Sequence, residues 1–162
     1  MCDNIILVED KTGIKKGRQL ISMFQNDYIL RMLEQVSKVI AYLTGLRRAG
    51  QHEKADEEVE MAYMQYVGMS GRLFDLIPTE NIIELINLSG QDWVRVAIAA
   101  NIMLEEARGD GLRGEAHQEK IRGKKAYQLM TEAKKHLDAD DFASEFLDLE
   151  RFADYQPMKL DY

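Results

Sequence analysis

The stretch from Gly50 to Ala62 constrains the fold of this chain more than any other. It reads glycine, four residues, Ala55, three residues, Val59, two residues and Ala62. Residues at these spacings share one face of an α-helix, and small side chains on that face allow a neighbouring helix to approach closely. A glycine ahead of them suits the end of a preceding helix. The stretch therefore predicts the turn and the second helix of an antiparallel helical hairpin.

The first helix of this hairpin is predicted to begin at Asp27, a good N-cap, and to end at Gly50. Its apolar residues step by four, three, four and three along Ile29, Leu33, Val36, Ile40 and Leu43. This is the stripe of an amphipathic helix. The second helix is predicted over about residues 52–67, with the small residues facing inward.

Further helices are predicted in the middle of the chain. A short turn of helix is expected at about residues 73–77, and Thr79, which follows Pro78, is expected to cap the next helix. Asp92 is expected to cap a helix that carries Trp93 on its inward face. The stretch 108–114, Arg-Gly-Asp-Gly-Leu-Arg-Gly, is so rich in glycine that it predicts an interruption.

The hairpin spacing recurs near the C-terminus. A helix predicted over about residues 115–136 carries Ala126, Met130 and Ala133 at the spacing of Ala55, Val59 and Ala62. Positions 55 and 126 differ by 71, which is about two repeats of roughly 34 residues. A last element, predicted from Asp140 to about Tyr155, presents aromatic and leucine side chains at helical spacing. They are Phe142, Phe146, Leu149 and Phe152.

These spacings resemble the tetratricopeptide-repeat-like helical superfamily over residues 23–155. The sequence of residues 26–35, Asn-Asp-Tyr-Ile-Leu-Arg-Met-Leu-Glu-Gln, also resembles the opening of an uncharacterised family of small helical proteins from Gram-positive bacteria. The expected fold class is all-α, with stacked antiparallel helical hairpins and a C-terminal capping helix. The stack is expected to be either a right-handed superhelix of the tetratricopeptide type or an irregular bundle.

The expected domain organisation is one helical domain over residues 23–155, followed by a tail over 156–162. Residues 1–22 differ in character, and they contain the basic group Lys15-Lys16-Gly17-Arg18. They are interpreted either as a disordered extension or packed arm, or as a non-native start that precedes Met23.

Composition excludes several classes of function. The formal net charge of −7 opposes generic binding to nucleic acid or to anionic membranes. Cys2 is the only cysteine, so an intrachain disulfide is excluded. No segment has the roughly 18 consecutive apolar residues of a transmembrane helix. A cytoplasmic protein is expected.

The superfamily resemblance implies a concave groove that binds a segment of a partner protein. On this chain the groove would be lined by Val94, Ile98, Asn101 and Arg47. Val94 and Ile98 stand where members that clamp a terminal carboxylate have lysine and asparagine. The resemblance therefore implies protein binding through an otherwise apolar groove, without a carboxylate clamp.

Motifs for catalysis or for cofactors are not found in the sequence. His52, His117 and His136 are scattered and lack zinc spacing, and Glu105-Glu106 lacks the Glu-x-x-His pair of di-metal bundles. No phosphate loop or nucleophile elbow is present. The expectation is a non-catalytic interaction or scaffold protein with no metal and no cofactor.

A nucleic-acid-associated accessory factor is the alternative function. Residues 108–125 hold six lysines and arginines against three acids, and Lys120, Arg122, Lys124 and Lys125 would make the contacts. Residues 138–162 hold eight acids against two cations. These regions are interpreted either as two solvated surfaces or as a basic surface that meets an acidic one. The acidic surface would belong to the same chain or to a second copy, and in the latter case a homodimer whose formation depends on salt is expected.

Overall fold

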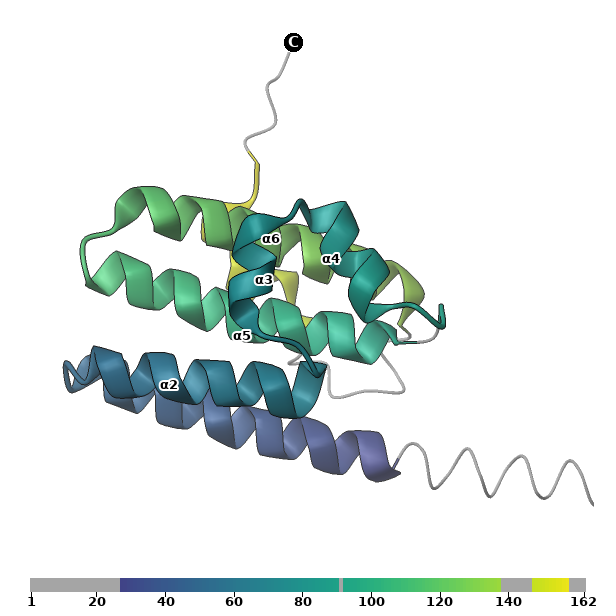
Figure 1. Ribbon diagram of the computed structural model, residues 1–162, viewed down its shortest axis with the longest axis horizontal. Coiled ribbons are helices and arrows are strands. Elements are labelled where there is room, and N and C mark those ends of the chain that lie inside the picture. Colours follow the sequence, from purple (N-terminus) through teal and green to yellow (C-terminus); the bar gives the residue numbers. More distant parts are fainter. Residues whose placement is uncertain (1–26, 91, 138–146, 158–162) are drawn as a thin grey trace, which may run out of the picture. The chain divides into compact units, whose positions relative to one another are not determined.

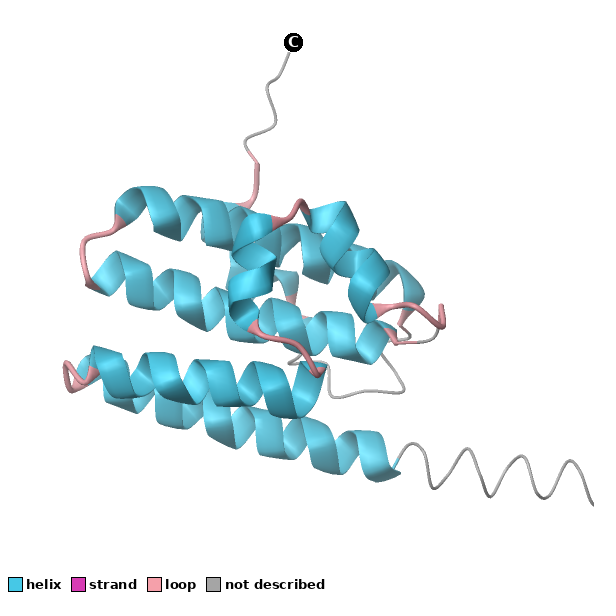
Figure 2. Cartoon of the chain, in the orientation of Figure 1, coloured by secondary structure: helices cyan, strands magenta, loops and turns pink. Residues whose placement is uncertain are grey.

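The computed structural model of the chain describes residues 27–90, 92–137 and 147–157. Every regular element within those ranges is helical, which confirms the predicted all-α class (Figures 1 and 2). Internal contacts divide the chain into two units, residues 1–32 and residues 33–162. Residues 27–32 of the first unit are helical. The predicted boundary between residues 22 and 23 lies outside the described residues.

The second unit opens with a helix over residues 33–48. The elements that follow it in chain order are α2 (His52–Ala62), the π-helix η1 (Tyr63–Val67), α3 (Gly71–Leu76), α4 (Thr79–Ile86), α5 (Trp93–Leu112), α6 (Ala116–His136) and the 3-10 helix η3 (Leu149–Tyr155). None of the helices in the described part of the chain is both long enough and apolar enough to cross a lipid bilayer.

The turn at Gly50 forms as predicted. Gly50 has a φ of 75°, a left-handed conformation that glycine adopts without strain. Ala55, Val59 and Ala62 are all buried in α2, as the spacing predicts. The helix then widens to the π form and ends at Gly68, where φ is 83°. The small-residue face thus packs inward and leaves an acidic face of α2 outward.

Helix α5 forms the centre of the second unit. It packs most extensively against α6, which lies beside it, and it also contacts α2 and η1 (Figure 1). Ala97, Ala99, Ala100 and Ala107 are fully or almost fully buried, and these small side chains let neighbours approach from several directions. A helix enclosed on several faces need not be amphipathic, which explains why α5 is apolar around most of its circumference.

The predicted interruption over residues 108–114 is wrong for most of that stretch. Helix α5 continues to Leu112, and the turn comes at Arg113 and Gly114. The glycines stay helical because other side chains fill the space beside them. A methyl group on Gly109 would overlap the Arg47 guanidinium, and one on Gly111 would lie 2.8 Å from the Glu119 carboxylate. Tertiary packing therefore outweighs the low helix propensity of glycine.

Two predicted helix ends also need correction. Pro78 holds the N-cap position of α4, and Thr79 is its first helical residue. The Thr79 hydroxyl donates a 2.6 Å hydrogen bond to Gln128 on α6 and does not cap the helix. Near the C-terminus, residues 149–155 form a 3-10 helix that buries Phe152 and Tyr155. Asp140, Phe142 and Phe146 of the predicted capping element lie outside the described residues.

Candidate functional site

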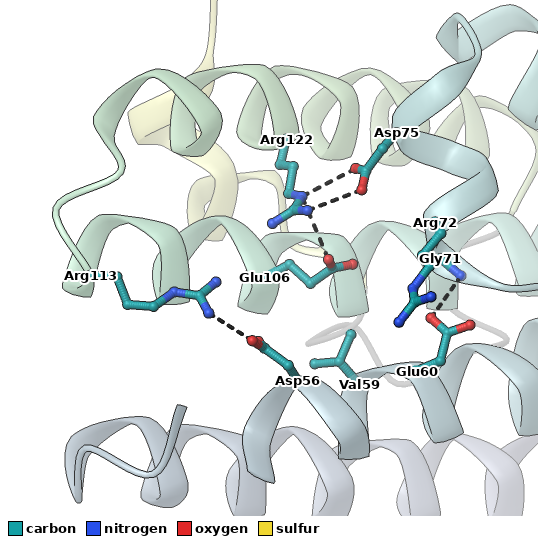
Figure 3. Close-up of a pocket in the computed structure, with 9 residues that line it drawn as sticks. All are labelled: Asp56, Val59, Glu60, Gly71, Arg72, Asp75, Glu106, Arg113 and Arg122. Carbon is teal, nitrogen blue, oxygen red and sulfur yellow. Dashed lines mark hydrogen bonds and ion pairs between the residues drawn. The ribbon is translucent and has the colours of Figure 1, made fainter. Parts of the chain in front are cut away.

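A charged cavity of about 240 Å³ lies where α2, α3, α5 and α6 meet. Figure 3 shows acidic and guanidinium groups from all four helices pointing toward one another. The residues that line the cavity are Asp56, Val59, Glu60, Gly71, Arg72, Asp75, Glu106, Arg113 and Arg122. Seven of these nine side chains are ionisable, so the pairing of their charges decides what the cavity can do.

Arg122 on α6 is the centre of the cluster. Its guanidinium donates to both carboxylate oxygens of Asp75 on α3, at 3.0 and 3.2 Å, and to Asp110 on α5, at 2.8 and 2.9 Å. The same group lies 3.5 Å from a carboxylate oxygen of Glu106, as Figure 3 shows. Fork-shaped pairing with carboxylates is the geometry that guanidinium favours. One side chain therefore joins three helices.

Asp110 links this cluster to a second arginine. Its side chain is fully buried and accepts a 2.9 Å hydrogen bond from Arg113 in addition to those from Arg122. Arg113 also donates to Asp56 on α2 at 2.7 Å. A buried carboxylate is tolerated only where charge and hydrogen bonds compensate its lost hydration. The two arginines supply that compensation.

Glu106 is the titrating group of the cavity. Burial raises the pKa of its carboxyl from 4.5 to about 7, against the opposing influence of Tyr63 and Arg122. Burial likewise holds the pKa of the Tyr63 hydroxyl well above its usual value. This hydroxyl faces Glu106 but has no well-formed hydrogen bond among the described residues. Glu106 is thus able to change its charge near neutral pH.

Glu60 and Arg72 are the remaining charged residues of the lining. One Glu60 oxygen accepts a 3.1 Å hydrogen bond from the Gly71 backbone N–H. Arg72 is exposed, and its guanidinium forms no ion pair with the described residues. Most of the lining charges are therefore neutralised by one another. Within the described ranges, no group of three or more His, Cys, Asp or Glu residues is arranged to hold a metal ion.

A second hollow of a different character lies between α4 and α6. This α4–α6 groove has a volume of about 480 Å³ and is mostly apolar. Its lining residues are Thr79, Glu80, Ile83, Glu84, Tyr127, Gln128, Thr131 and Glu132. Ile83 and Tyr127 are half-buried, and Glu80 and Glu84 are exposed. An apolar surface edged by carboxylates results.

The four residues predicted to bind a partner do not share an open face. Ile98 and Asn101 are completely buried in α5, Arg47 is 3% exposed, and Val94 is half-buried. Asn101 donates to the Ala97 carbonyl at 2.9 Å and accepts a 2.6 Å hydrogen bond from Arg151. Arg47 pairs with Asp56 at 3.3 Å. Partner binding at these four positions stays a prediction, and a partner there would have to displace the side chains that cover them.

The cations of residues 108–125 are largely used inside the fold. Arg108 pairs with Glu105 at 2.9 Å, and Lys125 donates to the carbonyls of Phe74 and Ile77 at 2.8 and 3.0 Å. Arg113 and Arg122 belong to the charged cavity. Arg108 is exposed although it is paired, whereas Lys120 and Lys124 are exposed and form no ion pair with the described residues. A phosphate backbone would meet two unpaired lysines instead of six unpaired cations, which weakens the nucleic-acid alternative.

Sequence reasoning missed both hollows. Glu106 and Asp110 are one helical turn apart, and this spacing would place them on one face of a helix. The expected break at residue 108 placed them on different elements instead. The glutamates at positions 80 and 84 are also one turn apart on α4 and flank Ile83. The helices that face them could not be assigned from spacing alone.

Comparison of the chain with protein-family models, with curated proteins and with solved structures gives no match.

Proposed function

We propose that this chain is a non-catalytic protein that binds a segment of a partner protein, with the α4–α6 groove as its contact surface. The observation that carries the proposal is the apolar lining of this groove around Ile83 and Tyr127, open to solvent and edged by carboxylates. Apolar surface in a groove supplies binding free energy, and a polar rim fixes orientation. Stacked hairpins of the tetratricopeptide type and a cytoplasmic location are parts of the same proposal.

The charged cavity supports a structural role better than a catalytic one. Arg113 and Arg122 are paired with Asp56, Asp75 and Asp110, so these two arginines are not free to stabilise the charge of a reacting group. Glu106 has a pKa near neutrality, but its raised value follows chiefly from burial. Structural networks of buried ion pairs perturb pKa values as active sites do.

A photo-crosslinking experiment tests the proposed function. Ile83 is replaced by a photo-reactive amino acid in the full chain, and the same replacement is made at Glu53, an exposed position on α2. Illumination in cells that express the variants is expected to give discrete protein adducts at position 83 and none at position 53. Equal adduct patterns at both positions, or no adducts at position 83, would argue against the groove as a contact surface.

A further inference from the structure

We infer that the partner segment bound by the α4–α6 groove is basic, with lysine or arginine side chains beside Glu80 and Glu84 and an apolar side chain against Ile83 and Tyr127. This inference rests on the proposed function and adds to it the chemistry of the partner. The charges that the fold leaves uncompensated at the rim of the groove point to this chemistry.

Glu80 and Glu84 are uncompensated acids. Both are exposed on α4, and neither forms an ion pair with a cation in the described part of the chain. They are four residues apart, so their carboxylates lie on the same side of the helix and repel each other. A cation placed between them relieves that repulsion.

The third glutamate of the groove differs from these two. Glu132 on α6 is paired with Lys135 at 2.8 Å and therefore presents little net charge to a ligand. The negative potential of the groove is accordingly concentrated along α4. A bound segment is expected to direct its cations toward α4 and its uncharged side toward α6.

The floor of the groove supplies the second element of recognition. Ile83 lies between the two glutamates in sequence, and Tyr127 faces the groove from α6. The Thr79–Gln128 hydrogen bond of 2.6 Å joins α4 to α6 beside them. Because this hydrogen bond holds α4 against α6, the floor of the groove is formed before a partner binds, which lowers the entropic cost of binding.

The length of α4 limits the size of the bound segment. Its eight residues span about 12 Å at a rise of roughly 1.5 Å per residue. This length matches about two turns of a partner helix, on which residues three or four positions apart share one face. Two cations and one apolar anchor fit on such a face. An anionic ligand such as nucleic acid is disfavoured because its phosphates would meet the glutamates.

The test uses two fluorescent peptides of roughly 18 residues, a length that favours helix formation. One is built from leucine, alanine and lysine, and the other has glutamate at every lysine position. Each is titrated with the full chain. We expect the basic peptide to bind, with an affinity that falls as salt is added, and the acidic peptide not to bind.

Two double variants of equal charge locate the contact. Glu80→Gln with Glu84→Gln removes the rim charges, whereas Glu53→Gln with Glu57→Gln removes two exposed glutamates one turn apart on α2. The rim variant is expected to weaken binding of the basic peptide about five- to tenfold, and the α2 variant is expected to leave it nearly unchanged. Equal weakening by both variants would mean attraction by net charge alone and would overturn the inference.

Two further outcomes separate this inference from the proposed function. If neither peptide binds, or if the acidic peptide binds as well as the basic one, while crosslinking at position 83 still gives protein adducts, the groove is a contact surface for a partner that is not basic.

Loss of binding by Ile83→Ser in a variant with unchanged helicity would support the apolar anchor. Binding that is insensitive to Ile83→Ser would contradict it.

Discussion

Gly45 and Gly109 are both helical glycines, but only Gly109 stands against another side chain. A methyl group at position 109 would overlap the Arg47 guanidinium, whereas one at position 45 meets no atom within 4 Å. Arg47 is buried, so its guanidinium would have to shift among packed neighbours to make room. We predict that Gly109→Ala lowers the free energy of unfolding by about 1–3 kcal/mol through overpacking. We predict that Gly45→Ala raises it by up to about 1 kcal/mol through helix propensity.

Urea denaturation of the two glycine variants, monitored by circular dichroism, measures both changes in the free energy of unfolding. The pair is matched because each change adds one methyl group inside a helix. Similar free energies of unfolding for the two variants would mean that Arg47 does not occupy the space beside Gly109.

Glu106 predicts a pH dependence of stability. Burial raises the pKa of its carboxyl from the ordinary value of 4.5 to about 7 in the folded chain, so the folded state holds its proton more tightly. The contribution of this proton to the free energy of unfolding is fully present below about pH 4.5. It is lost as the pH rises to about 7, by up to about 3 kcal/mol. In Glu106→Gln this loss is absent. We therefore predict that Glu106→Gln gains stability relative to the unaltered chain between pH 5 and pH 8.

Denaturant unfolding of both proteins at a series of pH values tests this prediction. The difference between the two proteins isolates Glu106, because every other ionisable group is common to both. A difference that stays constant across this range would show that the pKa of Glu106 is not raised.

At the scale of elements, Asp110 joins α5 to α6 and stabilises the turn that follows α5. Its carboxylate is fully buried and accepts hydrogen bonds from Arg113 and Arg122. We predict that Asp110→Ala lowers the free energy of unfolding by about 3–5 kcal/mol, because two guanidinium groups lose a buried partner. Lys135→Ala breaks the exposed pair with Glu132 and is expected to cost less than about 1 kcal/mol. Thermal melts of both variants check the contrast, and comparable losses would contradict it.

The sequence predicted the elements whose signals are local. The stripe from Leu33 to Leu43 and the buried face of Ala55, Val59 and Ala62 follow from helical periodicity, and both were found. The extent of α5 could not be predicted, because its glycines are helical only where Arg47 and Glu119 pack beside them. Such contacts join residues far apart in sequence. Glycine content alone therefore indicated a break.

The candidate sites show the same division. The charges of Glu106 and Asp110 were visible in the sequence, but their pairing with Arg122 depends on how α6 lies against α5. The resemblance predicts that Asn101 lines an open groove, yet its side chain is used in internal hydrogen bonds. Helical spacing identifies which residues share a face. It does not identify which element covers that face.

At the scale of the whole molecule, ion pairs within the chain determine which charges are left to interact with a partner. The chain carries −7, and Arg108, Arg113 and Arg122 are each bonded to acids of the same chain. These ion pairs largely neutralise the positive charge of the three arginines. The carboxylates at the rim of the α4–α6 groove, on a chain of negative net charge, attract cationic groups over a distance of about 10 Å at moderate salt. This long-range attraction is expected to favour association with the proposed basic partner over binding to nucleic acid.

The division into two units predicts how truncation acts on the fold. Among the described residues the buried core begins at Leu33, and residues 27–32 are exposed or half-buried. A chain that starts at Leu33 is therefore expected to melt cooperatively within a few degrees of a chain that starts at Asp27, because the residues removed between the two starts include no buried side chain. A chain that starts at Leu43 loses the buried side chains of Leu33 and Val36, and it is expected to melt well below both. Scanning calorimetry compares the three proteins. A large drop already at the Leu33 start would mean that residues 27–32 contribute to the core.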